Sequence, residues 1–377
     1  MTTFAPFELR ATAALPAGWL AWLGTALRTA RPTNIQPMPD GFGALVPALA
    51  DHGVLPLLYL RLRDSASWPG LPRDVQQTLT AAFQDAATRA LLQEAALSGL
   101  IAGLAAAGVR VALLKGAAVG RTVYGSPAER PINDFDLLVP RAQVEAARAA
   151  LIGLGFRALN LPQSGRLGAR LRQFRAELPF MGVGPQYGGL LVELHWALLE
   201  MPYYIHRIPM AEVWDAVEPT GEAGMWRPDR AALLLHAASH LALHHSRDLR
   251  LIWLLDIDRL AADSRLDWQR VVRLADAWNL ALAVQASLDA AARWLGAPAP
   301  AEVMAQLQHR ASDPAARALW GLGDERPGRA WRRAVTTLAV LPPRAKLSYA
   351  GWLALRAAVA AGDALRSRGI EARHAGR

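Results

Sequence analysis

The chain has 377 residues, of which 53% are hydrophobic and 19% are charged, a balance that is typical of a folded globular protein and excludes an intrinsically disordered chain. It has no cysteine, which excludes disulfides, thiolate nucleophiles and cysteine-bound metal sites. The formal net charge is +9, but the arginines are spread along the chain and form no basic stripe with aromatic partners. We therefore do not expect nucleic acid as a partner, although the charge favours the approach of a small polyanion.

The first residues give no sign of a targeting segment. Residues 1–19 lack the basic flank and the continuous apolar core of a signal peptide. No uncharged apolar run reaches the roughly 18 residues that a spanning helix needs. These patterns predict a cytoplasmic protein without a membrane span.

Helical spacing of apolar residues dominates the first part of the chain and predicts an N-terminal helical region over 1–107. The pattern then changes to a short apolar run, 109–114, which is bounded by glycines and indicates a buried strand. A short helix over 117–124 and a second strand over 134–139 are expected to follow. The change of hydrophobic period therefore marks the start of a different structural region.

A helix over 142–154 is expected next, with Gly155 as its C-terminal cap. Two more strands, over 177–183 and 190–195, are separated by a turn rich in glycine and proline. Together with the preceding strands they predict an α/β core over 108–227.

Helical periodicity returns after this core, with helices predicted over 230–245, 249–262 and 268–280. The C-terminal region, 228–377, is thus expected to be helical. The fold class that follows is α+β, with a small mixed β-sheet flanked by N-terminal and C-terminal helical regions.

Two aspartates stand one residue apart at the start of the predicted strand over 134–139. Successive side chains of a strand point to opposite faces, so Asp134 and Asp136 project from the same face. Two neighbouring carboxylates repel each other unless a cation lies between them or one is protonated. A divalent metal such as Mg²⁺ explains the pair and keeps coordination positions for phosphates, whereas an exposed strand edge is the simpler alternative.

Three further features favour the metal interpretation. Glu193 lies inside another apolar strand, where an unpaired carboxylate is costly to bury. Lys115 is one of two lysines in the chain, and Gly116 beside it allows a phosphate to approach the backbone closely. Arg130, four residues before Asp134, is suited either to hold a triphosphate oxygen or to pair with the acids. Together these residues indicate metal-assisted nucleotidyl transfer.

The pattern K-G-x(13)-R-P-x-x-D-x-D-L-L-V, followed by V-E-L-H-W, resembles the family of uncharacterised nucleotidyltransferases within the DNA polymerase beta-like superfamily. The resemblance extends over roughly residues 40–345. It is strongest at eight residues: Lys115, Gly116, Arg130, Pro131, Asp134, Asp136, Glu193 and His195. The segment 233–261, in which histidines precede an L-x-W-L-x-D-I pattern, is similar to the helical part of the same family.

The resemblance implies transfer of a nucleoside monophosphate from an NTP to an acceptor hydroxyl on a small molecule, a peptide or a protein. It implies catalytic and Mg²⁺- or Mn²⁺-binding roles for Asp134, Asp136 and Glu193, and nucleotide-binding roles for Lys115, Gly116 and Arg130. Alanines follow Lys115-Gly116 where many members have Gly-Ser or Gly-Gly. A degenerate fold that binds nucleotide or serves as an assembly partner without catalysis is therefore the alternative.

Histidines at intervals of four mark one face of the predicted helix over 230–245. His236, His240 and His244 would lie along that face, but no H-E-x-x-H zinc motif is present. His240 either packs against the core, contacts the acceptor or nucleotide, or binds zinc, and His244 is expected to meet solvent with its neighbour His245 at the helix end. His195 and His240 are the candidates for contact with the acceptor or for support of the acids.

A second D-x-D pair, Asp256 and Asp258, falls in a predicted helix. Residues two apart on a helix lie about 200° apart, so these carboxylates cannot share a metal by themselves. Asp256 is instead expected to pair with a nearby arginine, Arg250 or Arg259.

Overall fold

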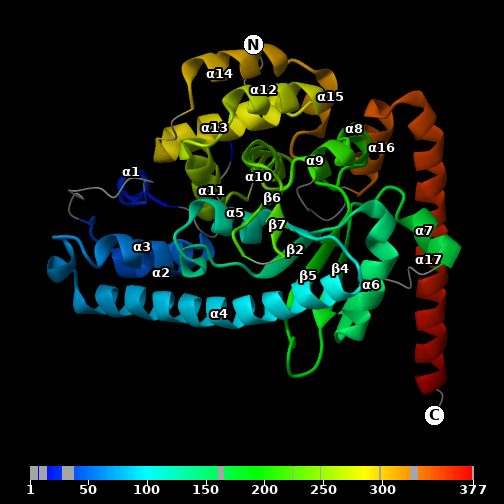
Figure 1. The fold of residues 1–377 in the computed structure, drawn as a ribbon, viewed down its shortest axis with the longest axis horizontal. Helices are drawn as coiled ribbons and strands as arrows, with labels where there is room; N and C mark the ends of the chain where they lie inside the picture. Colours follow the sequence, from blue (N-terminus) through cyan, green and yellow to red (C-terminus); the bar gives the residue numbers. More distant parts are fainter. Residues whose placement is uncertain are drawn as a thin grey trace.

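The computed structural model describes residues 7, 15–27, 38–159, 165–222, 224–246, 248–296, 299–322 and 330–375. The fold is α+β, as the sequence predicts, and a mixed sheet lies among helices from both ends of the chain (Figure 1).

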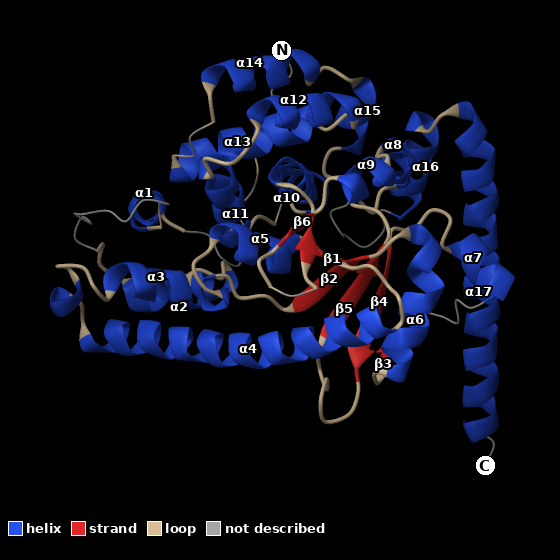
Figure 2. Cartoon of the chain, viewed as in Figure 1, coloured by secondary structure: helices blue, strands red, loops and turns tan. Residues whose placement is uncertain are grey.

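Seven strands of the described part form one sheet in the order β3-β4-β5-β2-β1-β7-β6 (Figure 2). They are β1 (Ala112–Leu113), β2 (Asp134–Leu138), β3 (Phe156–Ala158), β4 (Glu177–Gly182), β5 (Leu191–His195), β6 (Glu218–Pro219) and β7 (Trp226–Arg227). The central pair, β2 and β5, is parallel, whereas β1 pairs with β2 and β4 pairs with β5 in antiparallel fashion. The sheet is therefore mixed, with the two acid-bearing strands at its centre.

The helices before and within the sheet are α1 (Ala17–Ala26), α2 (Phe42–Asp51), α3 (Leu55–Leu62), α4 (Arg73–Ala106), α5 (Lys115–Val123), α6 (Val144–Gly153), α7 (Gly165–Leu171), α8 (Pro202–Arg207) and α9 (Met210–Asp215). Short 3₁₀ turns cover Trp68–Gly70, Pro127–Glu129 and Arg141–Gln143. The long helix α4 runs along one side of the molecule, from α2 and α3 to α6 beside the sheet (Figure 1).

The helices after the sheet are α10 (Arg230–His244), α11 (Leu251–Ala262), α12 (Trp268–Ala277), α13 (Ala281–Leu295), α14 (Ala301–Arg310), α15 (Pro314–Leu319), α16 (Ala330–Val340) and α17 (Pro343–Ala375). Helices α10 and α11 pack against each other and against α5, which follows β1. One hydrophobic core includes Leu23 of α1, Leu100 of α4, Phe135 of β2 and Leu234 of α10. The predicted division at 107/108 and 227/228 stays a prediction.

The element that follows β1 differs from the sequence prediction. The strand expected over 109–114 is reduced to Ala112–Leu113, and the helix expected over 117–124 begins at Lys115. Leu114 keeps an extended backbone and its N–H donates to the carbonyl of Asp136 at 2.9 Å, so the chain turns at Lys115. Lys115 and Gly116 therefore form the first turn of α5 instead of a loop.

The other predicted strands and helices over 134–280 begin and end within a few residues of the observed ones, but strands β3, β6 and β7 and helices α7, α8 and α9 were not predicted. Gly155 has φ 92° and follows Leu154, the C-cap residue of α6, as expected of a glycine in the left-handed region after a helix end. Among the helices of the described ranges, none is both long and apolar enough to cross a membrane.

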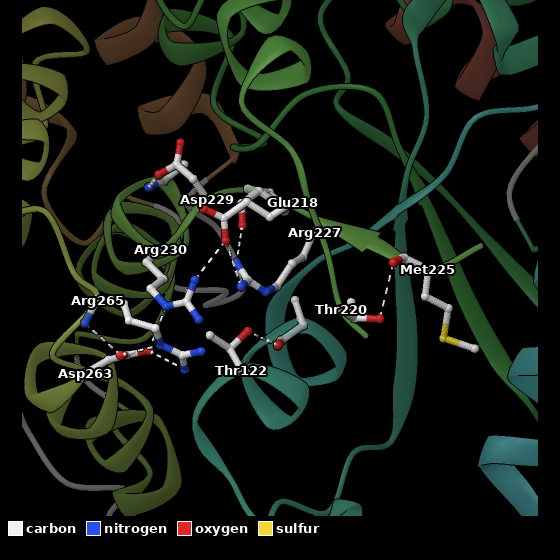
Figure 3. A network of polar contacts seen from close by, with 12 residues as sticks. Thr122, Glu218, Thr220, Met225, Arg227, Asp229, Arg230, Asp263 and Arg265 are labelled. Carbon is white, nitrogen blue, oxygen red and sulfur yellow. Dashed lines mark hydrogen bonds and ion pairs between the residues drawn. The ribbon is translucent and has the colours of Figure 1, made fainter. Parts of the chain in front are cut away.

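A network of charged side chains fixes the start of α10 against β6 (Figure 3). Glu218 Oε2 accepts a hydrogen bond from Arg230 Nη1 at 2.8 Å, and Arg230 Nε donates to Asp263 Oδ2 at 2.7 Å. Asp229 caps the helix by accepting a backbone N–H of the first turn at 3.0 Å. These contacts hold the histidine-bearing helix in a defined position relative to the sheet.

Candidate functional site

The register of the two central strands brings three carboxylates to one face of the sheet. Asp136 of β2 pairs directly with Glu193 of β5, and Asp134 pairs with Leu191. Because alternate residues of a strand share a face, Asp134, Asp136 and Glu193 project from the same side. The parallel pairing of β2 and β5, which the sequence does not specify, is what makes Asp136 and Glu193 neighbours.

The ammonium group of Lys115 lies between two of these carboxylates. Its Nζ is 2.7 Å from Asp136 Oδ1 and 2.9 Å from Glu193 Oε2. Burial alone would lower the pKa of Lys115, but the charges of Asp136 and Glu193 outweigh it and raise that pKa well above its ordinary value. The lysine is therefore a fixed cation in the position between the acids that a divalent ion would take.

The backbone of Lys115 is unusual. Its φ of 43° lies in the left-handed region, which costs a residue with a side chain of the order of 1 kcal/mol. The conformation falls at the abrupt turn from β1 into α5. The ion pairs with Asp136 and Glu193 offset this strain.

Gly116 has a packing reason to be glycine. A Cβ atom at this position would lie 2.8 Å from Ile132 Cγ2 and 3.2 Å from Arg130 Nη1. Any larger residue would therefore displace the segment that leads into β2. The proposed contact of Gly116 with a nucleotide stays a prediction.

His195 is buried behind the acids. Its Nε2 is 2.9 Å from Asp136 Oδ1, and its Nδ1 is 3.4 Å from Glu177 Oε2. Burial would lower the pKa of His195, but the charge of Glu177 and the hydrogen bonds to Asp136 and Glu193 raise it to about 10. The imidazole is thus a cation at neutral pH that holds Asp136, and because it is 1% exposed, we favour support of the acids over contact with the acceptor.

Asp136, Glu193 and His195 also form the group best suited to a metal within the described ranges. Each offers one ligand atom, and these atoms lie within 4.8 Å of one another. Asp136 and Glu193 are carboxylates suited to a divalent cation such as Mn²⁺ or Mg²⁺, whereas His195 would have to lose its proton before it could be a ligand. The metal ligands expected from the sequence were Asp134, Asp136 and Glu193, so His195 takes the place of Asp134 in this group.

Asp134 lies at the edge of the same cluster, at the first position of β2. Burial, together with the negative charges of Asp136 and Glu193, raises the pKa of Asp134 to about 6. The negative charges of the cluster thus act on the Asp134 carboxylate, although Asp134 is not part of the group formed by Asp136, Glu193 and His195.

Arg130 forms a bidentate ion pair with a residue of the C-terminal region. Its Nε and Nη2 donate to Asp256 Oδ1 and Oδ2 at 2.8 and 2.7 Å, and the Tyr124 hydroxyl donates to Oδ1 at 2.9 Å. The expectation that Asp256 pairs with Arg250 or Arg259 is therefore wrong. Helix α11 packs against α5, which directs Asp256 toward Arg130, while Arg259 lies over the Tyr124 ring at 4.2 Å.

Apart from the buried His195, the predicted site residues line one cavity of about 1250 Å³. This is larger than most small-molecule pockets, which occupy roughly 300–1,000 Å³. One wall carries the acids and their cationic neighbours, namely Lys115, Gly116, Arg130, Asp134, Asp136 and Glu193. Helix α10 contributes three imidazoles, those of His236, His240 and His244, and His245 follows directly after the helix.

The imidazoles of α10 and its end form a row of ring contacts. His240 stacks on His244 with ring centroids 5.4 Å apart, its Nε2 is 3.2 Å from His245 Nε2, and His245 packs on Trp253 at 4.2 Å. Burial and the charge of Lys115 lower the pKa of His240 well below its ordinary value. His244 and His245 stand at the end of α10, as expected, where both are half-buried and line the cavity.

A zinc site on this row receives no support. Within the described residues, ligand atoms cluster in this way at Asp136, Glu193 and His195, and no three of them cluster on α10. The row is therefore better described as a neutral polar wall.

The sequence analysis did not identify two acids near the site, Glu177 and Glu200. Glu177 of β4 pairs with His195 across the sheet, and burial together with the charges of Glu200 and Glu193 raises the pKa of Glu177 to about 7, against the opposing effect of His195. Glu200 lines the cavity. A usable signal was present, because Glu177 begins a predicted strand whose other residues are mostly apolar.

The histidine row predicts a specific pH dependence of stability. Burial, followed by the charge of His244, lowers the pKa of His245 to about 4, so the folded protein keeps this ring neutral while the unfolded chain protonates it below about 6.5. The lowered pKa of His245 therefore costs no stability above pH 6.5. The free energy of unfolding decreases as the pH falls from 6.5 toward 4. Relative to His245→Asn, the wild type should lose up to about 2 kcal/mol between pH 7 and 5, measured by urea unfolding; a constant difference would contradict this.

A comparison with known protein families identifies the family of this chain. A model of the family described as uncharacterised nucleotidyltransferase matches residues 39–296. The match covers more than half of the chain, so this protein belongs to that family, which confirms the resemblance drawn from its motifs. A search of curated proteins gives no significant match.

Proposed function

We propose that this protein is a metal-dependent nucleotidyltransferase that moves a nucleoside monophosphate from an NTP to an acceptor hydroxyl on a small molecule, a peptide or a protein. The observation that carries the proposal is the pair of carboxylates, Asp136 and Glu193, held side by side around a cation on the wall of a large cavity. The cavity volume of about 1250 Å³ leaves room for a nucleotide and an acceptor together.

Each residue of the acid wall has a role in this proposal. Asp136 and Glu193 would hold Mg²⁺ or Mn²⁺, with Asp134 as a further carboxylate at the cavity edge. The bound ion would neutralise the triphosphate and polarise the phosphoryl group that is transferred. His195, hydrogen-bonded to Asp136, fixes the orientation of that carboxylate, as residues behind metal ligands commonly do.

Lys115 is proposed to exchange partners when substrates bind. Without nucleotide its ammonium compensates the acids, and with nucleotide it would contact the phosphates while a metal ion takes its place. The compact ammonium on a flexible stem suits such an exchange better than the wide guanidinium of arginine.

Removal of this tethered cation should tighten metal binding in the absence of nucleotide. Lys115→Met leaves Asp136 and Glu193 without their cation, so we expect the Kd for Mn²⁺ to fall at least about tenfold, or 1.4 kcal/mol, while the affinity for NTP decreases. Calorimetric titration measures both effects. The other lysine, replaced in Lys346→Met, is the matched control, and weaker Mn²⁺ binding by Lys115→Met would refute the competition.

Transfer itself is tested with each α-³²P-labelled NTP, Mg²⁺ or Mn²⁺ and a cell extract as the source of acceptors. We expect metal-dependent label on one acceptor and release of unlabelled pyrophosphate. Absence of labelled product with all four NTPs and both metals would refute the catalytic proposal.

A nucleotide-binding protein without catalysis is the second candidate. It is favoured by the engagement of both Lys115 and Arg130 in ion pairs and by Ala117 and Ala118, which offer no hydroxyl to a phosphate. Saturable NTP binding in calorimetry without any labelled acceptor would support this alternative.

A further inference from the structure

His236 lines the cavity without a hydrogen-bond or ion-pair partner for its ring nitrogens within the described residues, a property that it shares with His244. The residue is 3% exposed and lines the cavity. Within the described residues its contact is with the ring of His240, at 6.4 Å between centroids, and neither nitrogen has a hydrogen-bond or ion-pair partner. A neutral imidazole that borders a cavity and has no protein partner has a donor and an acceptor nitrogen available to a ligand.

The position of His236 links it to the acid wall. Helix α10 packs against α5, whose first residue is Lys115. Burial, and then the charges of Lys115 and His195, lower the pKa of His236 well below its ordinary value. The ring is therefore neutral at physiological pH, with one protonated nitrogen and one free lone pair.

We propose that His236 is a catalytic residue that binds the acceptor hydroxyl and takes its proton during transfer. This role rests on the proposed nucleotidyltransferase function. The acceptor oxygen forms a bond to the α-phosphorus, the bond from that phosphorus to the bridging oxygen breaks, and pyrophosphate leaves with the electron pair. The hydroxyl proton moves to the free nitrogen of His236 and is afterwards released to water. A positioned imidazole is well suited to this transfer.

The same wall defines the class of acceptor. His240, His244 and His245 continue from His236 along the cavity and end at the aromatic surface of Trp253. Neutral imidazoles donate and accept hydrogen bonds, as hydroxyl groups do. The acceptor that fits is a hydroxyl-bearing molecule.

The test compares two substitutions with a matched control. His236→Ala removes the ring and leaves space, His236→Gln fills the space without a base, and His309→Ala changes an exposed histidine of α14. Both His236 variants should lose about 10²- to 10⁴-fold in label transfer, while the Kd of an α,β-methylene NTP stays within about threefold of wild type. Added free imidazole should restore transfer in His236→Ala but not in His236→Gln, which a purely structural role would not produce.

Three results would overturn this role. Transfer by His236→Ala equal to that of a working wild type excludes His236 from the chemistry. If the variants lose affinity for the NTP analogue by the same factor as they lose transfer, or if imidazole does not restore transfer, the residue supports the fold or the nucleotide site. Wild-type protein that labels no acceptor overturns the proposed function first, before any variant is compared, and the role of His236 fails with it.

Discussion

Asp136→Asn should reduce nucleotidyl transfer about a thousandfold, which corresponds to the several kcal/mol that a bound metal contributes to the transition state. The carboxylate of Asp136 is 2% exposed and accepts from both Lys115 and His195. An amide of the same size keeps the packing but removes the charge that both the metal and these two cations require. Transfer is measured with the labelled NTP that the wild type uses.

A second readout of Asp136→Asn does not depend on activity. Saturating Mn²⁺ at pH 8 should raise the melting temperature of the wild type over that with chelator, since a ligand that binds only the folded state stabilises it. The variant should lose most of this increase. Asp289→Asn, an exposed carboxylate of α13, is the control and should behave as wild type; full transfer or an unchanged metal effect in Asp136→Asn would remove Asp136 from the metal site.

Arg130→Met should destabilise the protein by about 3–5 kcal/mol, the usual cost of leaving one member of a buried ion pair without its partner. Arg130 is 9% exposed and Asp256 is 4% exposed, and their bidentate contact joins the segment before β2 to α11. Urea unfolding followed by circular dichroism measures the loss. A change within about 0.5 kcal/mol would show that the pair contributes little.

The double variant Arg130→Met/Asp256→Leu separates structure from nucleotide binding. Replacement of both partners by apolar residues should recover most of the lost stability. If Arg130 also contacts the triphosphate, as its motif implies, the restored double variant still binds NTP at least about tenfold more weakly than wild type. Wild-type NTP affinity in the double variant would limit Arg130 to a structural role.

The local patterns of the sequence were sufficient for most of the secondary structure. The hydrophobic run and the D-x-D spacing predicted β2 and the shared face of its two aspartates, because side-chain alternation is a property of any single strand. The strand β1 begins three residues later than predicted, at Ala112 instead of Val109, and the extended Leu114 that follows it donates a hydrogen bond to the carbonyl of Asp136. No local pattern contains that contact.

The sequence by itself therefore determined the α+β class, the family and the residues that line the site, since these depend on short motifs and on hydrophobic period. Only the tertiary structure decided what those residues touch. Lys115 lies between two acids because β2 pairs with β5, and Arg130 meets Asp256, 126 residues away, because α11 packs against α5. The physical reason is that ion pairs form between side chains of elements that pack against each other, and that this packing depends on the whole core and not on any local sequence pattern.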